Sequence, residues 1–347
     1  RPGSRLAEQM EYYIPPEKPE TDFLKINGPE DIKVCDPAFG SGHMLTYAFD
    51  LLYAMYEEEG YDSAEIPEKI LTHNLFGIEL DERAGELAAF ALTMKARSRQ
   101  RRFFNKRVKP NICVLEKVDF SPEELSEYIS SVGRDLFTHG LHETLQQFSE
   151  ADNFGSLIVP TVANVVDVLA TLESKDMSSN LFLAETHKKV LSVLRMAEAL
   201  SPRYAVVVAN PPYMGGKGMN PRLSTWAKEN FPSSKSDLFA MFIERNLDLA
   251  VKGGAVAMIT MQSWMFLSSF ESLRSRILNQ HTILSMAHLG ARPIDSIGGE
   301  VVSTTAFVLE NTHRPDYRGA YMRLVDGNSE AEKMEMLGKA IAQGRAA

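Results

Sequence analysis

The chain has 347 residues, with 37 lysines and arginines against 46 aspartates and glutamates, which gives a net charge of −9. Its 44% hydrophobic and 24% charged residues are typical of a globular protein and exclude a disordered or collagen-like chain. The longest apolar runs are far shorter than the roughly 18 residues that suggest a membrane span, so we expect no membrane partner. A chain of this length has room for a sizeable core and for about two average domains.

The two cysteines, Cys35 and Cys113, lie in apolar segments and form no CxxC pair. This pattern excludes a disulfide framework and a zinc cluster, and it favours a reducing, cytoplasmic location. The histidines show no spacing typical of metal ligands, so we predict no metal site. The chain begins at Arg1 without a signal-peptide pattern, and we expect it to be a piece of a longer protein.

The first 120 residues predict the beginning of an α/β sheet. Residues 1–30 are rich in Pro, Glu and Gly and are interpreted as a leader or linker. From residue 31 short apolar runs alternate with helical periods, which indicates parallel strands joined by helices. The expected strands cover 32–35, 75–80 and 112–115, and the expected helices cover about 43–58 and 81–96.

After residue 119 this alternation stops and later resumes. Residues 121–201 indicate an inserted helical subdomain, with helices expected at 162–172 and 183–199. Further strands are expected at 205–209, 255–261, 283–289 and 304–309, with helices at 238–251 and 270–278. Because little helix separates the last two strands, we expect the final strand to enter the sheet as an antiparallel partner.

The segment from Asp36 to Gly42 (Asp-Pro-Ala-Phe-Gly-Ser-Gly) directly follows the first predicted strand. Glycines at such a turn let the backbone approach a ligand at the carboxyl edge of the sheet, which indicates a nucleoside-type cofactor. Alone, a glycine-rich turn is weak evidence, because many are ordinary tight turns. The carboxylate of Asp36 would repel a pyrophosphate and attract a cation, so it disfavours NAD and suits S-adenosylmethionine (SAM).

Acidic residues also lie at the ends of the next two predicted strands. Glu79 can accept hydrogen bonds from both ribose hydroxyls of a nucleoside. The alternative is an acid at a helix N-terminus, although Asp81 is better placed for that role. After the third strand, Asp119 offers a carboxylate to an adenine amine and Phe120 offers a ring to the base; taken alone, this pair does not decide the matter.

The most informative segment is Asn210-Pro211-Pro212-Tyr213, at the end of an apolar strand. An amine on a planar ring or amide is a poor nucleophile because its lone pair is delocalised. The Asn210 side-chain oxygen and the Pro211 carbonyl could each accept one N–H and favour a tetrahedral nitrogen, while Tyr213 supplies a face for the planar group. The alternative is a turn with a packed tyrosine, because Asn-Pro often initiates turns.

Two further segments allow two interpretations each. Residues 214–218 (Met-Gly-Gly-Lys-Gly) predict a mobile loop beside the active site, in which Lys217 either contacts phosphate or is only solvated. Residues 95–109 hold eight cations and no acid. This basic run is either a solvated helix end and turn or a phosphate contact.

In this order the segments resemble the amino (N6-adenine) DNA methyltransferases in which the cofactor motif precedes the catalytic motif. The resemblance covers nearly all of residues 31–311, and it implies a Rossmann-like SAM-dependent fold with a mostly parallel seven-stranded sheet. Cofactor-binding positions would be Asp36, Ala38, Gly40, Gly42, Glu79, Asp119 and Phe120, with Phe242 of the Ser236–Phe242 segment helping to line the pocket. Catalytic positions would be Asn210, Pro211, Pro212 and Tyr213.

Details around these motifs look most like the PglX methyltransferases of BREX phage-defence systems. This resemblance implies SAM as the cofactor, double-stranded DNA with a flipped-out adenine as the substrate, and other BREX proteins as partners. Residues 12–15 match the usual cofactor-covering segment poorly. The catalytic domain is expected at 31–311, and 312–347 would be a linker toward an absent target recognition domain.

Two other functions remain open at this point. The same Asn-Pro-Pro-Tyr chemistry would suit a methyltransferase acting on a glutamine amide of a protein, although the helical insertion and the basic run favour a nucleic acid. Alternatively, the domain could bind SAM as a regulatory scaffold of a defence complex.

Overall fold

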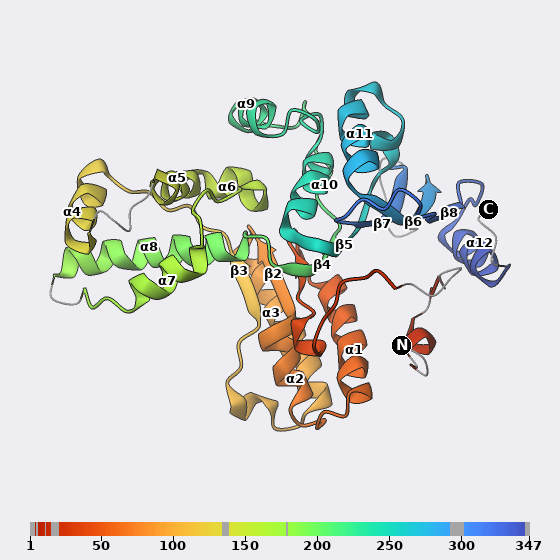
Figure 1. The fold of residues 1–347 in the computed structure, drawn as a ribbon, viewed down its shortest axis with the longest axis horizontal. Helices are drawn as coiled ribbons and strands as arrows, with labels where there is room; N and C mark the ends of the chain where they lie inside the picture. The colour runs from red at the N-terminus through yellow and green to blue at the C-terminus, as the bar shows by residue number, and fades with distance from the viewer. Residues whose placement is uncertain are drawn as a thin grey trace.

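The computed structural model describes residues 4, 6–10, 12–14, 21–133, 139–177, 180–291 and 302–343. Its centre is one eight-stranded sheet formed by β1 (Val34–Asp36), β2 (Leu75–Glu79), β3 (Asn111–Val114), β4 (Tyr204–Ala209), β5 (Ala250–Met261), β6 (Thr282–Gly290), β7 (Thr304–Glu310) and β8 (Ala320–Arg323). The strand order is β3-β2-β1-β4-β5-β7-β6-β8 (Figure 1). The predicted α/β class is therefore confirmed.

The strands from β3 to β5 pair in parallel, whereas β7 pairs antiparallel with both β5 and β6. This confirms the antiparallel entry of the final predicted strand. The expected number of seven strands is corrected, because β8 adds an eighth strand that runs parallel to β6. The sequence signal for β8 was weak, since the strand has four residues and buries only Met322.

The segment 312–347, which was expected to be a linker, contains β8 and the helix α12 (Glu330–Gln343). Met322, Leu324 and Ala340 form a small buried cluster between them. The ammonium of Lys333 donates hydrogen bonds to the carbonyls of Leu289 (2.6 Å) and Leu324 (3.0 Å). These contacts attach α12 to the end of β6.

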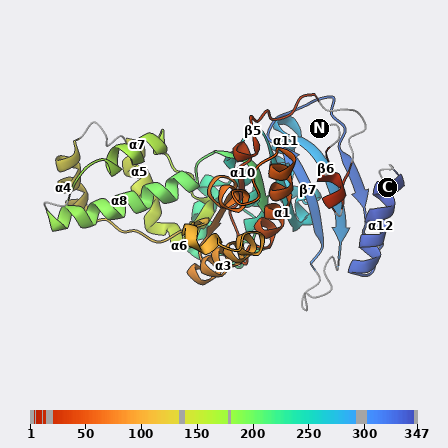
Figure 2. The ribbon, with the colours of Figure 1, turned by 90° about the horizontal axis from the view of Figure 1, so that it is seen from below.

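Helices cover both faces of the sheet. The helices α1 (His43–Glu58), α2 (Ile66–Lys69) and α3 (Glu82–Arg99) lie on one face, and α10 (Leu238–Leu249) and α11 (Glu271–Gln280) lie on the other (Figures 1 and 2). The period of two residues in a strand separates the two cores, because Val34 and Leu75 join the cluster of α1 and α3 whereas Cys35 and Phe76 join that of α10. Successive residues of one strand thus pack into the hydrophobic cores on opposite faces of the sheet.

The helical insertion extends to one side of this sheet (Figure 1). It comprises α4 (Pro122–Val132), α5 (His139–Gln147), α6 (Ala151–Phe154), α7 (Val165–Glu173) and α8 (Leu181–Ala199). A capping box between Ser121 and Glu124 starts α4, and the side chain of Asn180 caps α8. A further helix, α9 (Pro221–Asn230), follows β4 and packs Trp226 on Phe154 of α6 with ring centroids 4.2 Å apart.

One buried arginine of α10 holds the insertion against the sheet. Arg245 is 1% exposed, and its guanidinium donates to the carbonyls of Ser156 (2.9 Å), Ile158 (2.8 Å) and Leu200 (2.5 Å). Burial lowers the pKa of Arg245 to about 10, which leaves the side chain charged at neutral pH. The charge is stabilised by three carbonyl dipoles, and in return those buried carbonyls have a donor.

We expect Arg245→Met to lower the free energy of unfolding by at least about 3 kcal/mol, because three buried carbonyls lose their donor. Thermal and urea unfolding of the variant measure this loss. Arg195→Ala is the matched control, since Arg195 is an exposed partner of Glu173 and such surface pairs contribute about 0–1 kcal/mol. Equal unfolding midpoints for the two variants would contradict the role of Arg245.

Candidate active site at the carboxyl edge of the sheet

The glycine-rich turn between β1 and α1 has a backbone that requires glycine at two positions. Gly40 has φ +52° and Gly42 has φ +80°, both in the left-handed region. A Cβ atom on Gly42 would also lie 3.1 Å from the ring of Phe39. The turn therefore exposes backbone rather than side chains between Asp36 and the start of α1.

The carboxylate of Glu79 accepts a hydrogen bond from the backbone of this turn. Its Oε2 atom accepts the N–H of Gly40 at 2.7 Å, while Oε1 accepts the N–H groups of Leu80 (2.8 Å) and Asp81 (3.2 Å). Asp81 is the N-cap of α3 and accepts the N–H of Arg83. The helix-capping role thus belongs to Asp81, and Glu79 is aimed at the turn.

Asp36 is a buried carboxyl group at the end of β1. It is 3% exposed, and its Oδ1 atom accepts the N–H of Ala38 at 3.1 Å. Burial, and secondarily the negative charge of Glu79, raises the pKa of Asp36 to about 7. Among the described residues no lysine or arginine forms an ion pair with Asp36. A carboxyl group in this environment would bind a cationic ligand favourably.

The Asn-Pro-Pro-Tyr segment follows β4, whose parallel neighbour is β1, so it lies at the same edge as the glycine turn. The hydroxyl of Tyr213 donates to Oδ1 of Asn210 at 3.2 Å and to the carbonyl of Ile259 on β5 at 3.4 Å. Asn210 and Pro212 are exposed and Pro211 is buried. The ring of Tyr213 is 36% exposed and meets Phe239 edge to face at 6.1 Å, and burial raises the pKa of Tyr213 to about 12.

The segment 214–218, expected to be a mobile loop, is hydrogen-bonded to the start of α10. Met214 donates its N–H to Oδ1 of Asp237 (3.0 Å) and accepts the N–H of Leu238 (3.1 Å), and Gly216 donates to the carbonyl of Ser236 (3.0 Å). Asp237 also caps α10. Sequence reasoning missed this anchor, although a Ser-Asp pair before an apolar helix is a typical capping signal.

Phe242, which was predicted to help line the pocket, lies on α10 one turn after Phe239. It is 6% exposed and belongs to the main hydrophobic core. The aromatic residue of α10 that meets Tyr213 is instead Phe239. Phe239 was not among the predicted site residues, although the helical spacing places it one turn before Phe242 on the same face of the helix.

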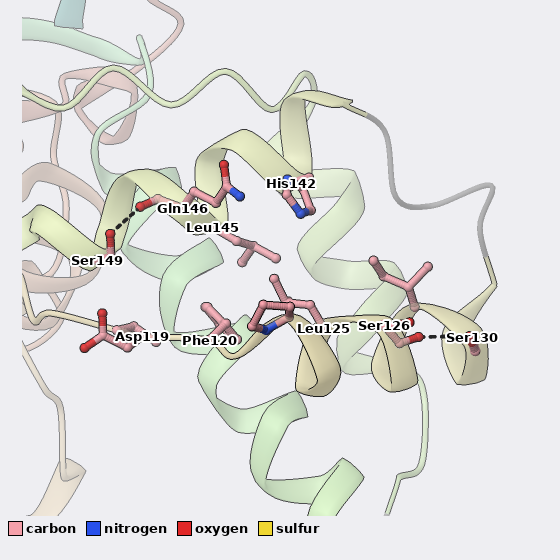
Figure 3. Close-up of a pocket in the computed structure, with 12 residues that line it drawn as sticks. Asp119, Phe120, Leu125, Ser126, Ser130, His142, Leu145, Gln146 and Ser149 are labelled. Atoms are coloured by element: carbon pink, nitrogen blue, oxygen red, sulfur yellow. Dashed lines mark hydrogen bonds between the residues drawn. The ribbon is translucent and has the colours of Figure 1, made fainter.

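Asp119 and Phe120 lie beyond β3, which ends at Val114. The carboxylate of Asp119 is 3.4 Å from Lys117, and the ring of Phe120 lies 5.8 Å from the ammonium of Lys189. Within the described ranges neither residue bonds to the glycine turn. They line a cavity of about 540 Å³ between α4 and α5, shown in Figure 3 with residues that include Leu125, His142 and Leu145. The structure thus associates this pair with the insertion.

The basic run lies at the opposite end of the sheet from the glycine turn, because α3 runs back from the carboxyl end of β2. Lys95 and Arg99 pair with Asp50 at 2.5 Å and 3.2 Å, and Lys106 pairs with Glu68 at 2.7 Å. These internal pairs and this position favour the interpretation of a solvated helix end over a phosphate contact.

Two kinds of feature are absent from the described ranges. No helix there has the length and apolar character needed to cross a bilayer. In the same ranges no three His, Cys, Asp or Glu side chains are grouped so that they could hold a metal ion.

Comparison with known proteins adds a family and two relatives. The model of the family described as "Eco57I restriction-modification methylase" matches residues 73–294. The adenine-specific methyltransferase BrxX of Escherichia coli O9:H4 (strain HS) is 41% identical, over 97% of this chain and 31% of that protein. The adenine-specific methyltransferase PglX of Lacticaseibacillus casei (strain Zhang) is 38% identical, over 88% of this chain and 26% of that protein. The chain therefore spans less than a third of the length of these curated relatives.

Among solved structures, a nuclease-deletion mutant of the Type ISP restriction-modification enzyme LlaGI, in complex with a DNA substrate mimic, has a TM-score of 0.54. Its sequence is 14% identical, and the match covers 90% of this chain and 23% of that enzyme. At this identity the similarity concerns the fold, which the two chains share over almost the whole length described here.

Proposed function

The chain belongs to the Eco57I restriction-modification methylase family, and on this premise we propose that it transfers a methyl group from SAM to N6 of adenine in double-stranded DNA. The observation that supports the proposal most strongly is that the ends of β1, β2 and β4 share one edge of the sheet. The glycine-rich turn, which would bind the cofactor, and Asn210, whose side-chain oxygen would accept an amine N–H, both follow strands that end at this edge. The names of the two curated relatives support adenine as the target base.

The residues at the turn fit SAM. The buried carboxyl of Asp36 would pair with a cationic part of the cofactor, and Glu79 would accept the ribose hydroxyls, sharing or replacing its bond to the Gly40 N–H. The backbone of Gly40 and Gly42 allows a close approach. When bound, SAM supplies an electrophilic methyl group on its sulfonium.

The chain's own residues would then prepare the amine. The Oδ1 atom of Asn210 and the carbonyl of Pro211 would each accept one N–H of the adenine amine, so that its lone pair points at the methyl group. Tyr213 offers one face of its ring to the base, and its hydroxyl steadies the Asn210 side chain. The hydrogen bond between Met214 and Asp237 would hold the loop beside these residues in place. In this scheme catalysis would rest on positioning and electrostatics, with no covalent intermediate.

An adenine inside a duplex cannot reach this edge, so the target base would be flipped out and stacked on Tyr213. Methylation of host DNA would mark it in a BREX-type defence system, with other BREX proteins as partners. A glutamine amide in a protein remains the chemical alternative, and the names of the curated relatives favour DNA over it. A SAM-bound scaffold without turnover is the third possibility that the experiment must separate.

Long-read modification mapping tests the proposal directly. Genomic DNA of cells with the intact gene is expected to carry N6-methyladenine at one sequence motif, and this methylation is expected to disappear on deletion. Radiolabel from SAM should then enter a duplex with that motif and not a protein extract. Identical maps with and without the gene would contradict the proposal, and label in protein would indicate the glutamine amide instead.

A further inference from the structure

Two adjacent apolar side chains protrude from the edge of the sheet that carries the candidate site. Phe266 is 60% exposed and Leu267 is 53% exposed. They follow the 3₁₀ turn η8 (Gln262–Met265), which begins directly after β5. Because β5 pairs in parallel with β4, its carboxyl end lies at the same edge as Asn210.

A hydrogen bond at one end of this turn and aromatic contacts at the other connect it to Tyr213. At the strand end, the hydroxyl of Tyr213 reaches the carbonyl of Ile259 at 3.4 Å. At the other end, the ring centroid of Phe270 is 5.9 Å from that of Phe239, which in turn is 6.1 Å from that of Tyr213. The exposed pair therefore sits on a segment that starts and ends near Tyr213.

The backbone that carries the pair is held in place. The guanidinium of Arg274 donates to the carbonyls of Trp264 (2.8 Å) and Leu267 (2.6 Å), and the N–H of Leu267 bonds to the carbonyl of Ser263 (3.0 Å). Trp264 is buried against Phe307. Single exposed apolar residues are common, but here two of them are fixed in an outward position beside a substrate site.

We propose that Phe266 and Leu267 form a wedge that enters the base stack of double-stranded DNA next to the target adenine and stabilises its flipped-out state. This inference rests on the function proposed above and adds the residues that open the duplex. Apolar side chains that enter a base step compensate part of the cost of unstacking, which is about a few kcal/mol per step.

The test compares two unmethylated duplexes that carry the target motif. In one the target adenine is paired, and in the other it lies opposite an abasic position. The double variant Phe266→Ala/Leu267→Ala, in the protein as the cell makes it, is expected to methylate the paired duplex about 10- to 100-fold more slowly. On the abasic duplex, where the base is already unpaired, its rate should stay within about threefold of the unaltered protein. Phe266→Leu retains an apolar side chain and is expected to keep most of the activity.

Leu87→Ala/Phe90→Ala is the matched control, since these α3 side chains are 57% and 62% exposed. It is expected to leave both rates unchanged. A wedge variant that equals this control on the paired duplex would overturn the inference. So would an equal loss on both duplexes, because that result indicates a general binding contact. If the unaltered protein methylates neither duplex, the proposed function fails and the wedge fails with it.

Discussion

Asn210→Ala is expected to reduce the rate of methyl transfer to DNA by about 10²- to 10³-fold, the usual cost of removing one preorganised hydrogen-bond partner of a transition state. The variant loses the Oδ1 acceptor that would shape the target amine. Tyr213 keeps its bond to the Ile259 carbonyl, so its ring should stay in place. Single-turnover methylation of a motif-containing duplex measures the rate, and calorimetry with SAM should give a dissociation constant within about threefold of the unaltered protein.

Two further variants make this prediction specific. Asn210→Asp retains an oxygen acceptor at the same position and is expected to keep more activity than the alanine variant. Asn105→Ala removes an exposed asparagine on the far side of the sheet and should change nothing. Methylation by Asn210→Ala at the normal rate would show that the amine is not held by residue 210.

Asp36→Asn is expected to weaken SAM binding by at least about tenfold at pH 8 while making the ligand-free protein more stable. The pKa of Asp36 is about 7 in the folded chain, against 3.8 for an aspartate outside a folded environment. The native state therefore binds the proton of Asp36 more tightly than the unfolded state does. The stability that this proton contributes is complete below pH 3.8 and is lost as the pH rises to 7. At pH 8 the buried charge costs on the order of a few kcal/mol, and the asparagine variant avoids that cost.

The same pKa gives cofactor binding a pH dependence with a defined sign. The ionised carboxylate attracts the cationic ligand, so the affinity of the unaltered protein for SAM should rise between pH 6 and pH 8 by about tenfold. In Asp36→Asn this rise should be absent. Asp62→Asn, an exposed site distant from the glycine turn, should retain it. Calorimetry at the two pH values decides the matter, and a parallel rise in all three proteins would refute the role of Asp36.

The parts that the sequence predicted well are those in which chemistry and geometry are local. Asp36 and Asn210 each follow an apolar strand directly, and parallel strands bring such residues to one edge. What sequence reasoning missed depends on distant partners. The N–H of Val118 donates a hydrogen bond to the carbonyl of Phe148, a contact between the chain after β3 and the insertion that no local pattern indicates.

Other differences have the same physical origin. Glycines in 214–218 suggested mobility because the hydrogen-bond partners of this segment in 236–238 are twenty or more residues away. The sequence left the basic run open between a solvated helix end and a phosphate contact, because its partners Asp50 and Glu68 are contributed by other helices. β8 was missed because its single buried residue gives no alternating pattern.

The guanidinium of Arg245 has one more consequence. It donates hydrogen bonds to the carbonyls of Ile158 and Leu200, so the two ends of the arm formed by α7 and α8 lie close together, while α8 also packs on β3 and α4. Only the end of the arm where α7 stops, at Glu173, is remote from the strands. We expect changes of length there to leave the chemistry at the sheet edge unaltered.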